Sequence, residues 1–278
     1  MEKRYTTFLT TLFIFTSCHS QPNQGDSILA AQPVAQNTQF DSNTKTIHVF
    51  VALCDNKYQG IVPVPKAIGN GQDTANNLYW GCGYGIKTYF KKSAQWKLVK
   101  TLKPGHPVLE RCIFQHKTNK NNYLVADAYD GAYIKQCTVD FLRATSGNEK
   151  DTLTVDGKTI GANGNAKLTA YIGHNGLMDF SLGRELEFTQ ADGQERKCII
   201  LACVSKSYFS SFISEAGAVP LVWTTGLMAP EAYTLHDAVN AWLAGETNAS
   251  VRLKAAAAYH KYQKCGEKAA RNLLVTGF

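Results

Sequence analysis

Several sequence patterns that identify common enzyme classes are absent from this chain of 278 residues. It contains no G-x-S-x-G elbow and no H-E-x-x-H motif, which argues against the common esterase and zinc-peptidase layouts. It also lacks the Walker and G-x-G-x-x-G patterns, and IGNGQD does not match either of them. The loop from Asp55 to Gln72 is therefore interpreted as a mobile substrate loop rather than a nucleotide site. No cysteines stand in C-x-x-C spacing and no histidine lies at zinc-finger distance from one. We therefore expect neither a metal nor another cofactor.

Charge of one sign is not concentrated anywhere in the chain. Charged residues make up 18% of the sequence, and the formal net charge of +7 comes from Lys and Arg spread along its whole length. Such a distribution does not predict nucleic acid as a partner. The hydrophobic share of 44% is enough for a sizeable core, and neither a repeat nor an interdomain linker is visible. Residues 46–278 are therefore expected to form a single domain.

The N-terminus contains a mostly apolar run, Thr7–Thr16, that is too short to cross a bilayer comfortably. Because the run follows a charged start, residues 1–17 have the layout of a signal peptide. The letters FTSC, which end at Cys18, resemble the lipobox of bacterial lipoproteins. That resemblance implies acylation of Cys18, with palmitate for example, and a place in the bacterial cell envelope, periplasmic or surface-exposed, with the lipid as the membrane contact. The alternative is a plain secretory signal.

The segment that follows is polar and rich in Gln, Asn and Ser. This composition predicts that residues 18–45 form a flexible tether between the lipid and the domain. Eight cysteines are present in all, so lipidation of Cys18 would leave seven. An odd number outside the cytoplasm implies at least one thiol that is unpaired or pairs with another molecule.

From residue 46 onward, short β-rich runs alternate with segments of helical periodicity. This alternation predicts an α/β fold, a three-layer sandwich with a mostly parallel sheet. The strands are predicted at 47–54, 96–102, 108–116, 122–131, 168–173, 198–203 and 220–225, with one antiparallel hairpin among the early ones and a small hairpin around Asp156 and Gly157. Helices are predicted from Asp73 or Thr74 to Phe90, and at 134–145, 207–215, 230–243 and 250–273.

Polar and reactive side chains follow the ends of several of these strands. In an open parallel sheet, ligands bind outside the carboxyl ends of the strands. The residues that this rule collects are Asp55, Asp127, Asp130, His174, Asn175, Cys203 and Thr224. The three aspartates are candidates for an acidic rim that binds a basic side chain or a hard cation, although Asp and Gly in DAYDG also favour a plain turn. Trp223 is expected at a strand end facing this edge.

His174 and Cys203 each directly follow an apolar run, LTAYIG and CIILA. A thiolate is a nucleophile that needs a base or an environment that lowers its pKa. Cys203 precedes a predicted helix and would lie near its positive N-terminal pole. His174, one strand away, is a candidate general acid for a leaving amine. The backbone N–H groups around Asn175, Gly176 and Cys203 are candidates for an oxyanion hole.

The segments YIGHNG and ILACVSKSYF are similar to the catalytic His and Cys motifs of the caspase-like cysteine peptidases, a group that includes caspases, legumain, gingipain and clostripain. The resemblance implies a caspase-like sandwich and hydrolysis of a peptide or protein substrate through an acyl-enzyme, with Cys203 as nucleophile and His174 as its partner. It also implies that VWTTGL, with Trp223 and Thr224, lines a substrate pocket. The family usually has Gly directly after the His, whereas this chain has Asn175 there and Gly176 next.

Two other interpretations stay open at the level of sequence. One is a non-catalytic α/β lipoprotein that binds a ligand or protein partner at the same edge of the sheet. The other is a thiol-assisted or metal-assisted hydrolase of a small molecule. Elsewhere, His236 lies in a predicted helix beside its apolar stripe, which favours a structural role.

Overall fold

The computed structural model describes residues 39–183 and 186–278, so the signal peptide, Cys18 and most of the tether predicted above lie outside the described residues. The sequence prediction of an α/β fold is confirmed, because a large, mostly parallel sheet is combined with helices. The strands are β1 (Lys45–Ala52), β2 (Trp96–Leu102), β3 (Val108–His116), β4 (Asn122–Tyr129), β5 (Lys150–Val155), β6 (Lys158–Asn163), β7 (Leu168–Ile172), β8 (Lys197–Leu201), β9 (Val219–Thr224) and β10 (Leu274–Val275).

The helices alternate with these strands along the chain. They are α1 (Ile86–Lys92), α2 (Ile134–Ser146), α3 (Ser205–Glu215), α4 (Ala232–Leu243), α5 (Asn248–Gln263) and α6 (Glu267–Leu273), with short 3-10 helices η1 (Gly131–Tyr133) and η2 (Gly176–Met178). None of the helices in residues 39–183 and 186–278 is long and apolar enough to cross a membrane.

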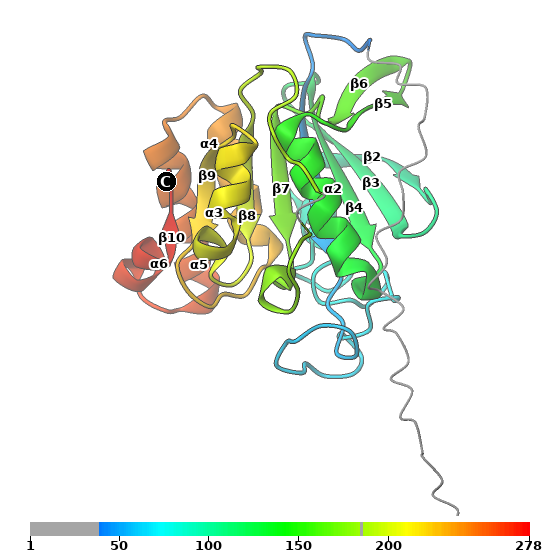
Figure 1. Cartoon of the computed structure of the whole chain (residues 1–278). Coiled ribbons are helices and arrows are strands. Elements are labelled where there is room, and N and C mark those ends of the chain that lie inside the picture. Colours follow the sequence, from blue (N-terminus) through cyan, green and yellow to red (C-terminus); the bar gives the residue numbers. More distant parts are fainter. Residues whose placement is uncertain (1–38, 184–185) are drawn as a thin grey trace, which may run out of the picture.

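The main sheet has eight strands in the order β10-β9-β8-β7-β1-β4-β3-β2, and β5 pairs with β6 in a separate hairpin. Neighbouring strands from β4 through β1, β7 and β8 to β9 are parallel. The β2–β3–β4 meander is antiparallel, as is the short β10 at the other end. In Figure 1 the arrowheads of β7 and β9 point to the same lower edge, where the loop that follows β1 also lies.

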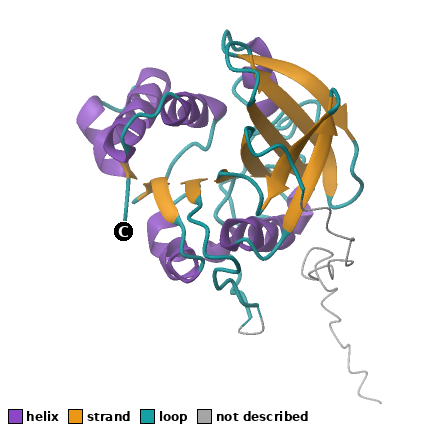
Figure 2. Ribbon diagram, turned by 90° about the horizontal axis from the view of Figure 1, so that it is seen from above, coloured by secondary structure: helices purple, strands orange, loops and turns teal. Residues whose placement is uncertain are grey.

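Two hydrophobic clusters occupy the two faces of the sheet. One lies under α1, α4 and α5, and the other lies under α2 and α3. Figure 2 shows the helices on both sides of the strands. The central strands are buried on both faces: every residue of β4 and every residue of β1 after its first is buried. Continuous apolar runs of this kind are typical of parallel strands covered by helices, which explains why the sequence signals them clearly.

Two helices differ from the sequence prediction. Only Ile86–Lys92 is helical in the segment predicted to begin at Asp73 or Thr74. The residues before it form turns, because Gly81 and Gly85 lie so close to neighbouring backbone that any side chain would collide with it. The predicted C-terminal helix is interrupted at Lys264 and Gly266, both with positive φ, and so divides into α5 and α6. The last strand, β10, is too short to give a sequence signal.

Candidate functional site

His174 and Cys203 follow two strands that lie side by side. β7 and β8 are parallel, and Ile172 at the end of one is opposite Leu201 at the end of the other. Each candidate residue stands two positions beyond this last pair. The side-chain amide of Asn175 also donates a 2.7 Å hydrogen bond to the carbonyl of Cys203. The structure therefore brings the two predicted residues to the same part of the carboxyl edge.

Asn175, which replaces the expected glycine, has a defined structural role. Its side-chain oxygen caps η2 by accepting a hydrogen bond from the N–H of Leu177, 3.1 Å away. Its amide group meanwhile bonds to Cys203. One side chain thus shapes the turn after β7 and joins it to the turn after β8, using both the donor and the acceptor of its amide.

The imidazole of His174 is held by an aspartate that sequence reasoning missed. Nε2 lies 2.7 Å from Oδ2 of Asp179, which also accepts a 2.8 Å hydrogen bond from the N–H of Gly60 in the loop after β1. The carbonyl of His174 accepts a 2.8 Å bond from the hydroxyl of Tyr171. A carboxylate on one ring nitrogen fixes the orientation and tautomer of a histidine. The only feature of the sequence that could have identified this partner was the presence of an acidic residue shortly after His174.

The other ring nitrogen of His174 is available. Among the described residues, no hydrogen bond involves Nδ1. In residues 39–183 and 186–278, the fully buried side-chain polar atoms without a partner belong to Thr46 and Thr234, and Nδ1 of His174 is not among them. Nδ1 therefore reaches solvent even though the residue as a whole is only 7% exposed. With Asp179 holding the proton on Nε2, Nδ1 carries the lone pair that a general base requires.

The thiol of Cys203 is half-buried in the turn between β8 and α3. Its Sγ lies 3.4 Å from the backbone nitrogen of Met228 and 3.6 Å from the carbonyl of the same residue. Among the described residues, no hydrogen bond joins this thiol to the imidazole of His174. In this conformation the segment after β9 covers the sulfur.

The turn that carries Cys203 is strained and firmly held. Val204 adopts φ 50° and ψ 31°, a left-handed conformation that is unfavourable for a β-branched residue. Its N–H donates to the carbonyl of Gly226 at 2.8 Å. Ser205 and Thr224 exchange backbone-to-hydroxyl hydrogen bonds of 3.1 Å and 2.9 Å, and the Thr224 hydroxyl also bonds to the carbonyl of Ala202. Strain of this kind persists only where surrounding contacts enforce it, and it clusters at functional sites.

Three backbone donors at this edge are free. Within residues 39–183 and 186–278, no hydrogen bond uses the N–H of Asn175, Gly176 or Cys203. Most buried backbone N–H groups in proteins are paired, and Gly176 is buried. All three donors are among the groups predicted for an oxyanion hole, and they follow the two adjacent strands.

Tyr79 is a second residue that the sequence did not single out. It lies in the turns before α1, buried in the cluster under α1, α4 and α5. Burial raises the pKa of its phenol well above the usual value, and the nearby thiols of Cys54 and Cys203 raise it further. Tyr79 therefore remains a neutral hydroxyl near the thiol of Cys203.

The buried cysteines differ from Cys203 in their surroundings. All seven cysteines of the described residues are free thiols. Burial raises the pKa of Cys54 to about 11 and that of Cys112 to about 12. It also raises the pKa of Cys137 and Cys198. Because the thiolate is the reactive form, these four are expected to be inert.

Asp55 and Asp130 do meet at the carboxyl edge, but both are buried. The side-chain amide of Gln72 donates to Oδ2 of Asp55 at 3.0 Å and to Oδ1 of Asp130 at 2.6 Å. His106 lies 3.4 Å from the other oxygen of Asp130. The acidic pair is thus engaged by the protein itself and organises the loop after β1.

Asp127 lies inside β4 rather than at its end, so the prediction that it terminates a strand is wrong. The guanidinium of Arg111 donates two 2.6 Å hydrogen bonds to its carboxylate, and Nε2 of His48 lies 3.1 Å away. Burial alone would raise the pKa of Asp127, but the charge and hydrogen bonds of Arg111, with a contribution from His48, hold it well below the usual range. The cause of the error is that an apolar strand can hold one buried charge when its partner lies on the next strand.

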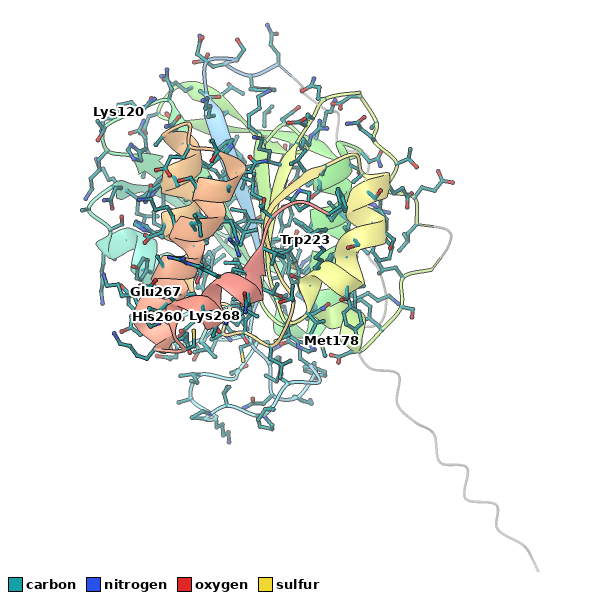
Figure 3. The ribbon with its side chains drawn as sticks, turned by 90° about the vertical axis from the view of Figure 1, so that its left-hand side faces the viewer. Lys120, Met178, Trp223, His260, Glu267 and Lys268 are labelled. Atoms are coloured by element: carbon teal, nitrogen blue, oxygen red, sulfur yellow. The ribbon has the colours of Figure 1, made fainter. Side chains whose placement is uncertain are left out.

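Trp223 and Thr224 also differ from their predicted setting, since both are fully buried. The Trp223 indole donates a 3.0 Å hydrogen bond to the carbonyl of Gly277 and packs against Phe278. Figure 3 labels Trp223 beside the C-terminal strand β10, with which it pairs. The hydroxyl of Thr224 hydrogen-bonds to the backbone of Ser205 and Ala202, on either side of Cys203, and is not exposed at the edge.

No cluster of three or more His, Cys, Asp or Glu side chains suited to a metal ion occurs in the described part of the chain. Comparisons with protein-family models, with curated proteins and with solved structures find no match to this chain.

Proposed function

We propose that this chain is a caspase-like cysteine peptidase in which Cys203 is the nucleophile, His174 transfers the proton and Asp179 orients His174. The observation that carries the proposal is the Asp179–His174 hydrogen bond at the end of the strand next to the one that leads to Cys203. Support also comes from the order of the parts, since His and Cys follow adjacent parallel strands as the resemblance implies. The strained turn at Val204 is consistent with a functional position.

The reaction follows from the groups at this edge. The Cys203 thiol transfers its proton to Nδ1 of His174, and the sulfur attacks the carbonyl carbon of a peptide bond. Asp179 stabilises the resulting imidazolium, and the N–H groups of Gly176 and Cys203 bind the oxyanion. The imidazolium then gives its proton to the leaving amine. A water molecule, deprotonated by His174, hydrolyses the thioester and releases the acid product.

Substrate binding requires a change at Met228. Its backbone occupies the hydrogen-bonding positions around the Cys203 sulfur, so the segment between β9 and α4 must move before a peptide can reach the thiol. Catalytic contacts are often long in a free enzyme and shorten only when substrate binds. The loop after β1, which touches Asp179 through Gly60, is the other segment placed to contact the peptide.

Alkylation of individual cysteines tests this assignment. With iodoacetamide near pH 7, we expect Cys203 to react about tenfold faster than Cys265, because His174 is placed to accept the thiol proton as the sulfur attacks. His174→Ala should remove this advantage. Cys265 is the matched reference because it is the exposed thiol among the described residues. Mass spectrometry of each cysteine-containing peptide gives the rates.

The same measurement separates the proposal from its alternative. Slow and uniform labelling of every cysteine, with no fast one at position 203, would contradict the catalytic assignment. It would favour a non-catalytic lipoprotein that binds a partner at this edge. A Cys265→Ala variant should leave the rate at Cys203 unchanged.

We also propose that the protein is a lipoprotein of the bacterial cell envelope, anchored through Cys18. The lipobox-like FTSC after a short apolar run supports this assignment. When the full chain is expressed in a bacterium, Cys18→Ala should move the protein from the membrane fraction to the soluble fraction and abolish incorporation of labelled palmitate. A wild-type chain that takes up no palmitate would instead indicate a plain secretory signal.

A further inference from the structure

A serine, a histidine and an aspartate form a hydrogen-bonded chain on another part of the molecule, between α1 and α4. Ser93 is the residue at which α1 ends, and its Oγ lies 2.8 Å from Nε2 of His236. The other ring nitrogen, Nδ1, lies 2.8 Å from Oδ1 of Asp237. Both distances match those of a nucleophile, its base and the group that orients the base.

The hydrogen bonds assign the proton positions. Because the carboxylate of Asp237 can only accept, Nδ1 of His236 carries the proton and Nε2 carries the lone pair. The N–H of Gln95 donates to the Ser93 Oγ at 3.1 Å, which leaves the hydroxyl proton free to point elsewhere. Its nearest acceptor is Nε2, at 2.8 Å, while Oε1 of Gln95 is at 3.0 Å. The side-chain nitrogen of Asn240 lies 3.2 Å from Nε2 and is a second, longer donor to the same lone pair. His236 is thus positioned to take the proton of Ser93.

The backbone around Ser93 is fixed, but the next residue has a free donor. The Ser93 N–H bonds to the carbonyl of Phe90, and its carbonyl accepts a 2.8 Å bond from the ammonium of Lys117. Among the described residues, no hydrogen bond uses the N–H of Ala94, which is exposed. A backbone donor directly after a nucleophile is a common element of an oxyanion hole.

Ser93 and His236 both line an open cavity of about 500 Å³. Tyr84, Tyr89 and Lys92 also line it. Tyr84 is 48% exposed and makes edge contacts with Tyr233 and Tyr262 behind it. A cavity that combines two tyrosines with a few polar side chains suits a small ligand that has an apolar part and a polar part.

We propose that this cavity is a second hydrolytic site, in which Ser93 cleaves small carboxylic esters with aromatic or short aliphatic acyl groups. The Ser93 Oγ attacks the ester carbonyl while its proton passes to Nε2 of His236, and the N–H of Ala94 binds the oxyanion. The alkoxide leaves with that proton. A water molecule gives a proton to His236 and hydroxide to the acyl-serine, which releases the acid and restores the hydroxyl. None of these residues belongs to the Cys203 site.

The test uses the intact protein with a fluorophosphonate probe and with p-nitrophenyl acetate. We expect one covalent adduct, located on Ser93 by peptide mapping, and ester hydrolysis that falls about 10²-fold to 10⁴-fold in Ser93→Ala and in His236→Ala. Ser207→Ala, at an exposed serine, is the matched control and should leave both adduct and rate unchanged. In Asp237→Asn, where the change acts through His236, kcat should fall while KM stays the same.

The position of the covalent adduct in the wild-type protein tests whether Ser93 is the nucleophile, even if a variant does not fold. An adduct on another serine, or no adduct at all, would overturn the proposal. So would ester hydrolysis that survives Ser93→Ala but disappears in Cys203→Ala, since Cys203 would then be the nucleophile. Conversely, an adduct on Ser93 with normal alkylation of Cys203 would support this site whether or not the peptidase proposal holds.

Discussion

Replacing Arg111 with methionine is expected to lower the free energy of unfolding by about 3–5 kcal/mol, because it leaves the carboxylate of Asp127 buried without its main partner. The Asp127 side chain is 1% exposed and takes both of its strongest hydrogen bonds from Arg111. His48 would remain beside it, although the other ring nitrogen of His48 already accepts from the N–H of Asn163. Chemical denaturation of the wild type and the variant measures the difference.

The stability that Arg111→Met loses relative to the wild type should depend on pH. In the wild type, the lowered pKa of Asp127 means that its ion pair stabilises the fold above the unfolded-state pKa of roughly 3.9 and loses this contribution as the pH falls. Without Arg111, burial should raise the pKa of Asp127 above that of the unfolded chain. The variant therefore becomes less stable as the pH rises. The difference in free energy of unfolding between the wild type and the variant should be larger at pH 8 than at pH 4.

Two further variants make this prediction specific. Arg271→Met removes an arginine from an exposed pair with Glu267, in which both side chains are more than half exposed. This change should cost less than about 0.5 kcal/mol. Adding Asp127→Asn to Arg111→Met removes the unpaired charge and should recover part of the loss. An Arg111→Met variant as stable as Arg271→Met would show that Asp127 does not depend on this pair.

Cys203→Ala is expected to abolish peptide hydrolysis, with a loss of kcat/KM of at least about 10³-fold, because alanine has no nucleophile that could form the acyl-enzyme. Asp179→Asn should lower kcat by about 10²-fold to 10⁴-fold, since an amide no longer fixes the His174 tautomer or stabilises its imidazolium. Initial rates on a fluorogenic peptide library give these values. The thiol of Cys203 should still be present and titratable in Asp179→Asn.

The control for this series is Cys265→Ala, which removes an exposed thiol that lies outside the proposed site. It should hydrolyse the library at the wild-type rate. Full activity in Cys203→Ala would refute the assignment of the nucleophile. A wild-type protein that cleaves no peptide would refute the peptidase proposal and leave the sheet edge as a binding surface.

Most of the secondary structure was predictable because it depends on local patterns of burial. The run Ile47–Cys54 is continuously apolar except for His48, and such runs occur where helices cover both faces of a parallel strand. The secondary structure was predicted wrongly where a local pattern competes with a tertiary constraint. Apolar residues at helical spacing predicted a helix from Asp73, but close backbone packing at Gly81 and Gly85 required turns.

The candidate site was predictable in position but not in composition. The ends of two apolar runs placed His174 and Cys203 at the carboxyl edge, since parallel strands end together. Nothing local identified Asp179 as the partner of the imidazole. Trp223 was predicted to face the edge because it is near a strand end, yet alternation along β9 directs it into the core under α2 and α3.

By itself, the sequence determined the α/β class, nearly all of the strands and the two strand ends that carry the His–Cys motif, because these follow from the spacing of apolar residues along the chain. Only the tertiary structure decided which polar groups meet. Asp127 pairs with Arg111 on the neighbouring strand, and Ser93 contacts His236, which lies 143 positions further along the chain. Contacts of this kind depend on how separate elements pack, and no periodicity along the chain records them.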